Sequence, residues 1–239
     1  MKALFLSDLH LPAEPSPLRE GFLRFLAGPA RAARSVWLLG DIFEYWIGDD
    51  VGLQVYAPEV AALRDLTAHG VAVHFMHGNR DFLVGRRFAH AADVTLAQDP
   101  VVVELDGRAA LLSHGDLWCT DDHAYQRWRR FSRNRAAQAL FVRLPRRLRE
   151  RVAGGVRSRS DSEKRNKPEA IMDVNPAAIE RALRRSGTRL LIHGHTHRPD
   201  DHALHIDGQP AQRIVLADWR PQRMEYLEAD RGALRRIVL

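Results

Sequence analysis

Short runs of apolar residues alternate along the chain with stretches in which apolar residues recur every three or four positions. The short runs predict strands at 3–7, 35–39, 71–76, 101–105, 108–113, 189–193, 214–217, 224–227 and 233–239. The helically spaced stretches predict helices at 18–27, 55–69 and 176–185, the last with Asn175 as N-cap and Pro176 at its first position. This alternation predicts an α/β fold, in which the loops that follow parallel strands gather at one edge of a sheet.

Short polar clusters follow the predicted strands. They are Asp8-Leu9-His10, Gly40-Asp41, Gly78-Asn79-Arg80-Asp81, Ser113-His114-Gly115-Asp116 and Gly194-His195-Thr196-His197. Imidazole, carboxylate and amide groups suit Mn, Fe or Zn, and the absence of thiolates argues against a structural zinc site. The clusters therefore predict two metal ions that share one carboxylate, in a hydrolase acting on phosphate esters or anhydrides.

The composition fits a globular enzyme and limits the alternatives. The chain has 239 residues, of which 45% are hydrophobic and 28% charged, so that it can bury a large core as one domain. The single cysteine, Cys119, excludes an internal disulfide and is compatible with a reducing compartment. We expect neither a signal peptide nor a membrane span, because no apolar run approaches the ~20 residues that a spanning helix needs.

Positive charge is concentrated in one segment. Between Arg127 and Lys167 there are 15 Lys or Arg residues and 3 Asp or Glu residues, although the net charge of the whole chain is only +6. Leu140, Leu144, Leu148 and Val152 are spaced four apart, which predicts a helical stripe, and Gly154-Gly155 is expected to interrupt a helix. We expect an insert at about 122–167 to form a basic helical lid that meets an anionic partner.

The clusters, in their order, resemble those of the calcineurin-like metallophosphoesterases. The resemblance implies a βαβα sandwich, with two mixed sheets flanked by helices and a helical lid insertion, as a single domain over 1–239. In such a family the first metal is held by Asp8, His10, Asp41 and His197. The second metal is held by Asp41, Asn79, His114 and His195, so that Asp41 bridges the two ions.

One residue departs from the commonest form of these motifs. Many family members have histidine where this chain has Arg80 in Gly78-Asn79-Arg80-Asp81. Arginine is a poor proton donor, but its guanidinium binds phosphate oxygens well. Arg80 therefore favours a phosphoanhydride, whose leaving group needs little protonation.

The segments S-D-L-H-L, G-D-I-F-E-Y-W-I-G-D-D, G-N-R-D, H-G-D and H-G-H-T-H-R-P resemble one narrower family, the UDP-2,3-diacylglucosamine pyrophosphatases of lipid A biosynthesis. The resemblance implies hydrolysis to UMP and 2,3-diacylglucosamine 1-phosphate, by attack on the α-phosphorus, with two Mn(II) ions per chain. It implies a peripheral protein on the cytoplasmic side of the bacterial inner membrane, which the basic lid would contact. No protein partner is implied.

The same resemblance assigns catalytic roles to Asn79, Arg80 and His195. It assigns substrate contacts to Asn79, Arg80, Asp122, Ser160, Lys164, Lys167 and His195. Trp46, Phe82 and Phe141 are candidates for a wall that contacts acyl chains. Two alternatives remain open: a general dimetal phosphodiesterase or nucleotide pyrophosphatase, and a module that binds nucleic acid through the basic insert, although no nucleic acid is expected as partner.

Overall fold

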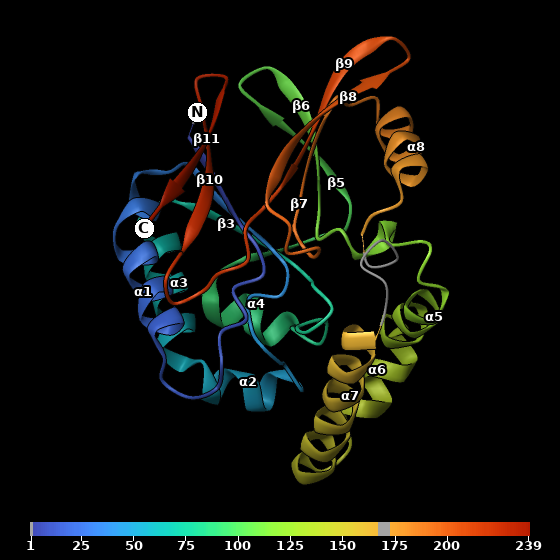
Figure 1. The fold of residues 1–239 in the computed structure, drawn as a ribbon. Coiled ribbons are helices and arrows are strands. Elements are labelled where there is room, and N and C mark those ends of the chain that lie inside the picture. Colours follow the sequence, from blue (N-terminus) through green and yellow to red (C-terminus); the bar gives the residue numbers. More distant parts are fainter. Residues whose placement is uncertain (1, 167–172) are drawn as a thin grey trace.

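Two mixed β-sheets form the centre of the molecule (Figure 1). The computed structural model describes the backbone of residues 2–166 and 173–239, and the side chains of these residues except 157–166. The first sheet has the order β11 (Ala233–Val238), β10 (Glu225–Asp230), β1 (Ala3–Leu6), β2 (Ser35–Leu39), β3 (Ala72–Met76) and β4 (Thr95–Ala97). The second has the order β5 (Val101–Leu105), β6 (Arg108–Ser113), β7 (Leu190–His193), β9 (Gln209–Val215) and β8 (Asp200–Ile206).

The strands are apolar on both faces because each sheet packs against a partner on either side. In β1, Ala3 and Phe5 face the second sheet, and Leu4 and Leu6 face the helices. The helices on that outer side are α1 (Pro17–Ala27), η1 (Pro29–Ala32), α2 (Asp49–Val55), α3 (Ala57–Ala68) and α4 (Arg86–Ala92). Helix α8 (Pro176–Ser186) covers the outer face of the second sheet with Ile179 and Leu183. The result is the expected sandwich of two mixed sheets flanked by helices.

Parallel pairing determines where the polar clusters lie. Strands β1, β2 and β3 are parallel neighbours in the first sheet, and β6, β7 and β9 are parallel neighbours in the second. The carboxyl ends of each set therefore lie at one edge of its sheet. Figure 1 shows the loops from both edges meeting at the centre of the molecule, above the helices that follow η2 (Asp116–Trp118).

Three helices form the basic segment: α5 (His123–Ser132), α6 (Arg135–Val142) and α7 (Arg146–Asn166). The Asp122 carboxylate accepts a hydrogen bond from the Tyr125 backbone N–H at 3.0 Å, and Asn134 caps α6 in the same way. The predicted break at Gly154-Gly155 is wrong, because α7 continues through both residues. A glycine in a helix costs only about 1 kcal/mol relative to alanine, which a long helix can absorb.

The far part of this segment is attached to the body of the protein. Arg149 of α7 is buried and donates from Nη1 to the Ile47 carbonyl at 2.6 Å and to Asp50 Oδ1 at 2.8 Å, and Nη2 also contacts this carboxylate. In the described part of the chain, no helix is both long and apolar enough to cross a bilayer.

Candidate metal centre

Every candidate ligand lies in a loop that follows a strand. Asp8 and His10 follow β1, Asp41 follows β2, Asn79 follows β3, His114 follows β6, and His195 and His197 follow β7. Five of them have a left-handed backbone, with φ of 55° at Asp8, 47° at His10, 53° at Asp41, 70° at His195 and 54° at His197. Non-glycine residues adopt this conformation rarely, and it concentrates at functional sites. The turns direct the side chains into one small space.

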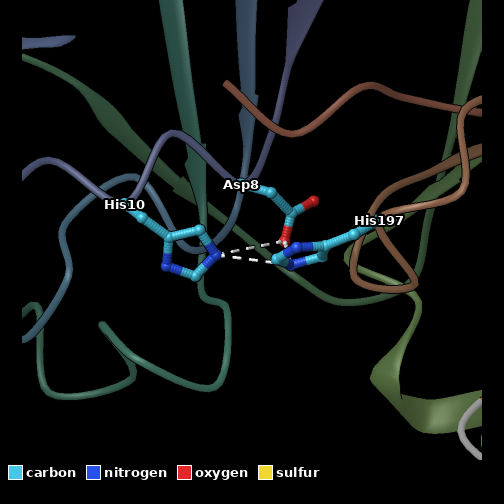
Figure 2. Close-up of side chains that lie close together, drawn as sticks. All are labelled: Asp8, His10 and His197. Atoms are coloured by element: carbon cyan, nitrogen blue, oxygen red, sulfur yellow. Dashed lines mark hydrogen bonds and ion pairs between the residues drawn. The ribbon is translucent and has the colours of Figure 1, made fainter. Parts of the chain in front are cut away.

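Asp8, His10 and His197 form the first group of donor atoms (Figure 2). Asp8 Oδ1 lies 3.4 Å from His197 Nε2 and 3.9 Å from His10 Nε2, and these two nitrogens are 3.4 Å apart. The other oxygen, Asp8 Oδ2, accepts hydrogen bonds from the Ser7 hydroxyl and the His195 backbone N–H. Asp8 Oδ1 is buried and makes no hydrogen bond, so that the donor set fits a metal ion.

Asp41, His114 and His195 form the second group. Asp41 Oδ2 lies 3.8 Å from His114 Nε2 and 3.9 Å from His10 Nε2 in the first group. Asp41 Oδ1 accepts a hydrogen bond from the Arg80 backbone N–H at 2.7 Å, which holds the carboxylate in this orientation. Asn79 Oδ1 lies 3.2 Å from His114 Nε2 and so joins the second group. A carboxylate between two groups of donors is the arrangement that two metal ions require.

Neighbouring acceptors orient the imidazole rings. His114 Nδ1 lies 2.9 Å from the Leu39 carbonyl oxygen, and His10 Nδ1 lies 3.1 Å from Glu44 Oε2. A proton on each Nδ1 leaves Nε2 as a free acceptor directed at the donor groups, as metal-binding histidines require. Glu44 is a site residue that the sequence analysis missed, although it lies only three positions after Asp41.

The site has a strongly negative potential. Burial alone lowers the pKa of His114, but the carboxylates of Asp41 and Asp8 outweigh this effect and raise the pKa to about 9. Burial raises the pKa of Asp8, but His197 and the other imidazoles hold it well below its usual range. Burial, followed by the charge of His114, lowers the pKa of His195 to about 3. An ionised carboxylate pair that stabilises a proton on a buried imidazole also favours a metal cation there.

Asp81 supports the backbone under the site. Its carboxylate accepts hydrogen bonds from the Gly78 backbone N–H at 2.7 Å and from the Ile42 backbone N–H at 2.8 Å. Asp81 therefore orients the loops that carry Asn79 and Asp41. Burial and the nearby Asp41 carboxylate raise the pKa of Asp81 to about 6.

Two glycines are required by close approach. A Cβ atom on Gly78 would lie 2.1 Å from Asp41 Oδ1, and one on Gly194 would lie 2.2 Å from Asp8 Oδ2. Contacts this short do not occur, so that only glycine allows these loops to approach the carboxylates.

A buried ionic network joins α5 to the metal centre. Asp116 Oδ2 lies 2.7 Å from the Tyr125 hydroxyl, 2.9 Å from Arg129 Nε and 3.5 Å from Arg133 Nη2. Arg133 also donates to the Gly78 carbonyl at 3.0 Å, directly before Asn79. The sequence analysis missed this network. The spacing of Tyr125, Arg129 and Arg133, four residues apart, could have revealed it, because such residues share one helix face.

The other residues predicted to contact the substrate differ in their distance from the metal centre and in how far the structure describes them. The Arg80 side chain is mostly buried beside the first group, with Nη1 4.0 Å from Glu44 Oε1. Asp122 is the N-cap of α5. Tyr125 in the first turn of this helix has its ring centroid 5.8 Å from that of His195. Ser160 and Lys164 lie on the backbone of α7 within the segment whose side chains are not described, and Lys167 lies outside the described residues. Trp46 does not form a substrate wall, because it is 2% exposed and packs against Phe43 and Phe88.

The sequence has clear relatives. The sequence profile described as calcineurin-like phosphoesterase matches residues 1–199. A UDP-2,3-diacylglucosamine hydrolase of Aeromonas hydrophila is 46% identical over 222 residues, which cover 93% of this chain and 92% of the relative. One of Pseudomonas paraeruginosa is 48% identical over 223 residues, with coverage of 93% and 92%. One of Chromohalobacter salexigens is also 48% identical, with coverage of 93% and 91%. The chain therefore belongs to the calcineurin-like phosphoesterase family.

Proposed function

We propose that the protein hydrolyses the pyrophosphate bond of UDP-2,3-diacylglucosamine, which yields UMP and 2,3-diacylglucosamine 1-phosphate. The observation that carries this proposal is the Asp41 carboxylate between two groups of donor atoms. The relatives of 46–48% identity, which match 93% of the chain and are named UDP-2,3-diacylglucosamine hydrolase, support the choice of substrate.

Seven side chains are proposed to hold two Mn(II) ions. The first ion would be bound by Asp8, His10 and His197. The second ion would be bound by Asn79, His114 and His195, and both ions would be bound by Asp41. Bound there, the ions would supply an activated water and clamp the phosphoryl oxygens. The donors are carboxylate, imidazole and amide groups, which suit Mn(II).

Arg80 is proposed to neutralise the phosphoryl oxygens. Its backbone N–H fixes Asp41, and its side chain lies beside Glu44 at the edge of the first group. A permanently charged guanidinium stabilises spread negative charge and cannot protonate a leaving group efficiently. The products of a pyrophosphate substrate leave as stable phosphate groups, which need no such proton. We propose that the remaining substrate contacts are made by Asn79, Asp122, Ser160, Lys164, Lys167 and His195.

The lid is proposed to bind the acyl chains and the membrane surface. Seven of the ten exposed large hydrophobic residues in the described part of the chain belong to α5–α7: Trp128, Phe131, Leu140, Val142, Leu148, Val152 and Val156. Exposed arginines lie on the same helices, at 127, 130, 135, 146, 147 and 151, and one lies between α6 and α7, at 143. Exposed apolar side chains interspersed with arginines fit lipid tails beside anionic head groups. We propose the cytoplasmic surface of the inner membrane as the location of the protein.

Replacing Phe131 and Leu140 by serine is expected to weaken binding to anionic phospholipid vesicles by about tenfold or more, because each exposed side chain loses its transfer into the lipid interface. Co-sedimentation with vesicles measures the effect. Val238→Ser is the matched control, since Val238 is 58% exposed on β11, outside the lid. Equal losses in both variants would contradict a specific role of the lid.

Hydrolysis tests the substrate directly. The Mn(II)-loaded protein is expected to release UMP from UDP-2,3-diacylglucosamine, and in oxygen-18 water the label should enter UMP, because water attacks the α-phosphorus. Failure to release UMP would refute the proposal. Hydrolysis of simple phosphodiesters without activity on the lipid would indicate a general phosphodiesterase, and tight salt-sensitive DNA or RNA binding without hydrolysis would indicate a nucleic-acid module.

A further inference from the structure

A polar pocket lies directly beside the metal centre, on the outer face of the second sheet. It has a volume of about 290 Å³, and its walls include Asp173, Thr196, Arg198, His202, Arg213 and Val215. Thr196 stands between the candidate ligands His195 and His197, so that the pocket and the metal centre share one loop.

Two buried polar atoms of the pocket lack hydrogen-bond partners. Thr196 Oγ1 and Arg213 Nη1 are both buried and make no hydrogen bond to any described residue. A third such atom, His193 Nε2, lies on the same side of the sheet, because His193 pairs with Val215 in the adjacent strand. Buried polar groups are nearly always satisfied, so that the two unsatisfied groups of residues that line this cavity indicate a ligand with complementary polar atoms.

The charged groups of the pocket define that ligand further. Asp173 lies between two arginines, with Arg198 Nη1 3.5 Å from its Oδ2 and Arg213 Nη1 3.8 Å from its Oδ1. The pocket thus offers donors on the arginine and threonine side chains and an acceptor on the carboxylate. A uracil ring has the matching pattern, since its two carbonyl oxygens accept hydrogen bonds and the imide N–H between them donates one.

The position of the pocket distinguishes the two halves of the substrate. The lid helices, with their exposed apolar side chains, lie below the central loops in Figure 1, and the pocket is lined by the start of β8 and the end of β9, next to those loops. Apolar acyl chains therefore fit the lid, and a polar ring fits the pocket beside Thr196.

We propose that this pocket binds the uracil ring of the substrate and makes the enzyme selective for a uridine nucleotide. The proposal rests on the proposed function. Thr196 and Arg213 donate to the ring carbonyls, and Asp173 accepts from the ring imide. The side chains of this pocket are specificity residues, and they take no part in the hydrolysis itself.

Calorimetric titration of the Mn(II)-loaded full-length protein tests the proposal. UMP is expected to bind the wild type about tenfold or more tightly than ribose 5-phosphate, which carries the same phosphate without the ring. Thr196→Val and, separately, Arg213→Met should remove most of this preference and leave the affinity for ribose 5-phosphate within about twofold. UMP methylated at the imide nitrogen should lose the preference in the wild type. Arg64→Met is the control, because Arg64 is exposed on α3, outside the pocket, and this variant should bind UMP normally.

Two results would overturn the proposal: equal affinities of the wild type for UMP and ribose 5-phosphate, or a preference that survives both substitutions. These results are separate from the failure of the proposed function. If the protein releases UMP from the lipid substrate but does not bind UMP more tightly than ribose 5-phosphate, the proposed function stands and only the proposed uracil site is refuted. If the protein binds UMP more tightly than ribose 5-phosphate but does not hydrolyse UDP-2,3-diacylglucosamine, the proposed function is refuted.

Discussion

Replacing Asp41 by alanine is expected to abolish turnover. The Asp41 carboxylate is the only group that lies within 4 Å of imidazole nitrogens from both donor groups, among the ion pairs of the described residues. Its loss would remove one ligand from each ion and the fixed charge between them. Metal assistance contributes several kcal/mol to the stabilisation of a phosphoryl transition state, so we expect a decrease in kcat of about a thousandfold or more.

The measurement combines UMP release with metal content by atomic emission. Asp65→Ala is a suitable control, since Asp65 is an exposed carboxylate on α3 that pairs with Arg31. Asp65→Ala should retain wild-type activity and two ions per chain. If Asp41→Ala bound both ions and hydrolysed the substrate at a near-normal rate, Asp41 would not be the bridging ligand.

The second large effect is expected for Arg80. Replacing it by alanine should lower kcat by about a hundredfold to a thousandfold, as happens when one donor to a developing oxyanion is removed. Metal occupancy should remain close to that of the wild type, because the link from residue 80 to Asp41 is made by its backbone N–H, which alanine retains.

Arg80→Lys separates charge from geometry. Lysine keeps the positive charge but lacks the planar fork of guanidinium, so that it should recover only part of the lost rate. Metal analysis of each variant is the essential second measurement. Loss of both ions from Arg80→Ala would show that the side chain holds the site together and has no direct role at the phosphate.

The sequence allowed the metal centre to be anticipated because its parts are local. Each cluster directly follows a short apolar strand, and parallel strands place their carboxyl ends together whatever their separation in the chain. Asp8 and Asp41 follow the neighbouring parallel strands β1 and β2 and are therefore predictable neighbours, and the Asp8 backbone N–H donates to the Gly40 carbonyl at 3.0 Å. The meeting of Asp8 with His195 joins the two sheets, and strand pairing alone does not predict it. Family resemblance supplied the division of the ligands between two ions.

Other elements were missed because their patterns are weak. Strand β8 is an edge strand with the polar sequence DDHALHI, and strand β9 begins five residues before the predicted strand, at Gln209. An edge strand with one solvated face lacks the apolar run that identifies a buried strand. Missing this hairpin hid the pocket, since Arg213 and His202 come from it.

Contacts between distant segments, and the division of one predicted helix, were also not predicted. Asp49 at the start of α2 accepts hydrogen bonds from the Gly85 and Phe88 backbone N–H groups at the start of α4. The predicted stripe from Leu140 to Val152 is divided between α6 and α7 at Pro145. Such partners are far apart in sequence, and no local pattern encodes them.

The fastening of the lid at two places has a practical consequence. Asp116 holds α5, and Ile47 and Asp50 hold Arg149 of α7, while Phe131 and Leu140 between these points are 61% and 66% exposed. The purified enzyme therefore exposes a hydrophobic surface to water. We expect it to adsorb to plastic and to self-associate in dilute buffer, and rates measured without detergent or carrier protein would then report the amount of enzyme lost as well as its chemistry.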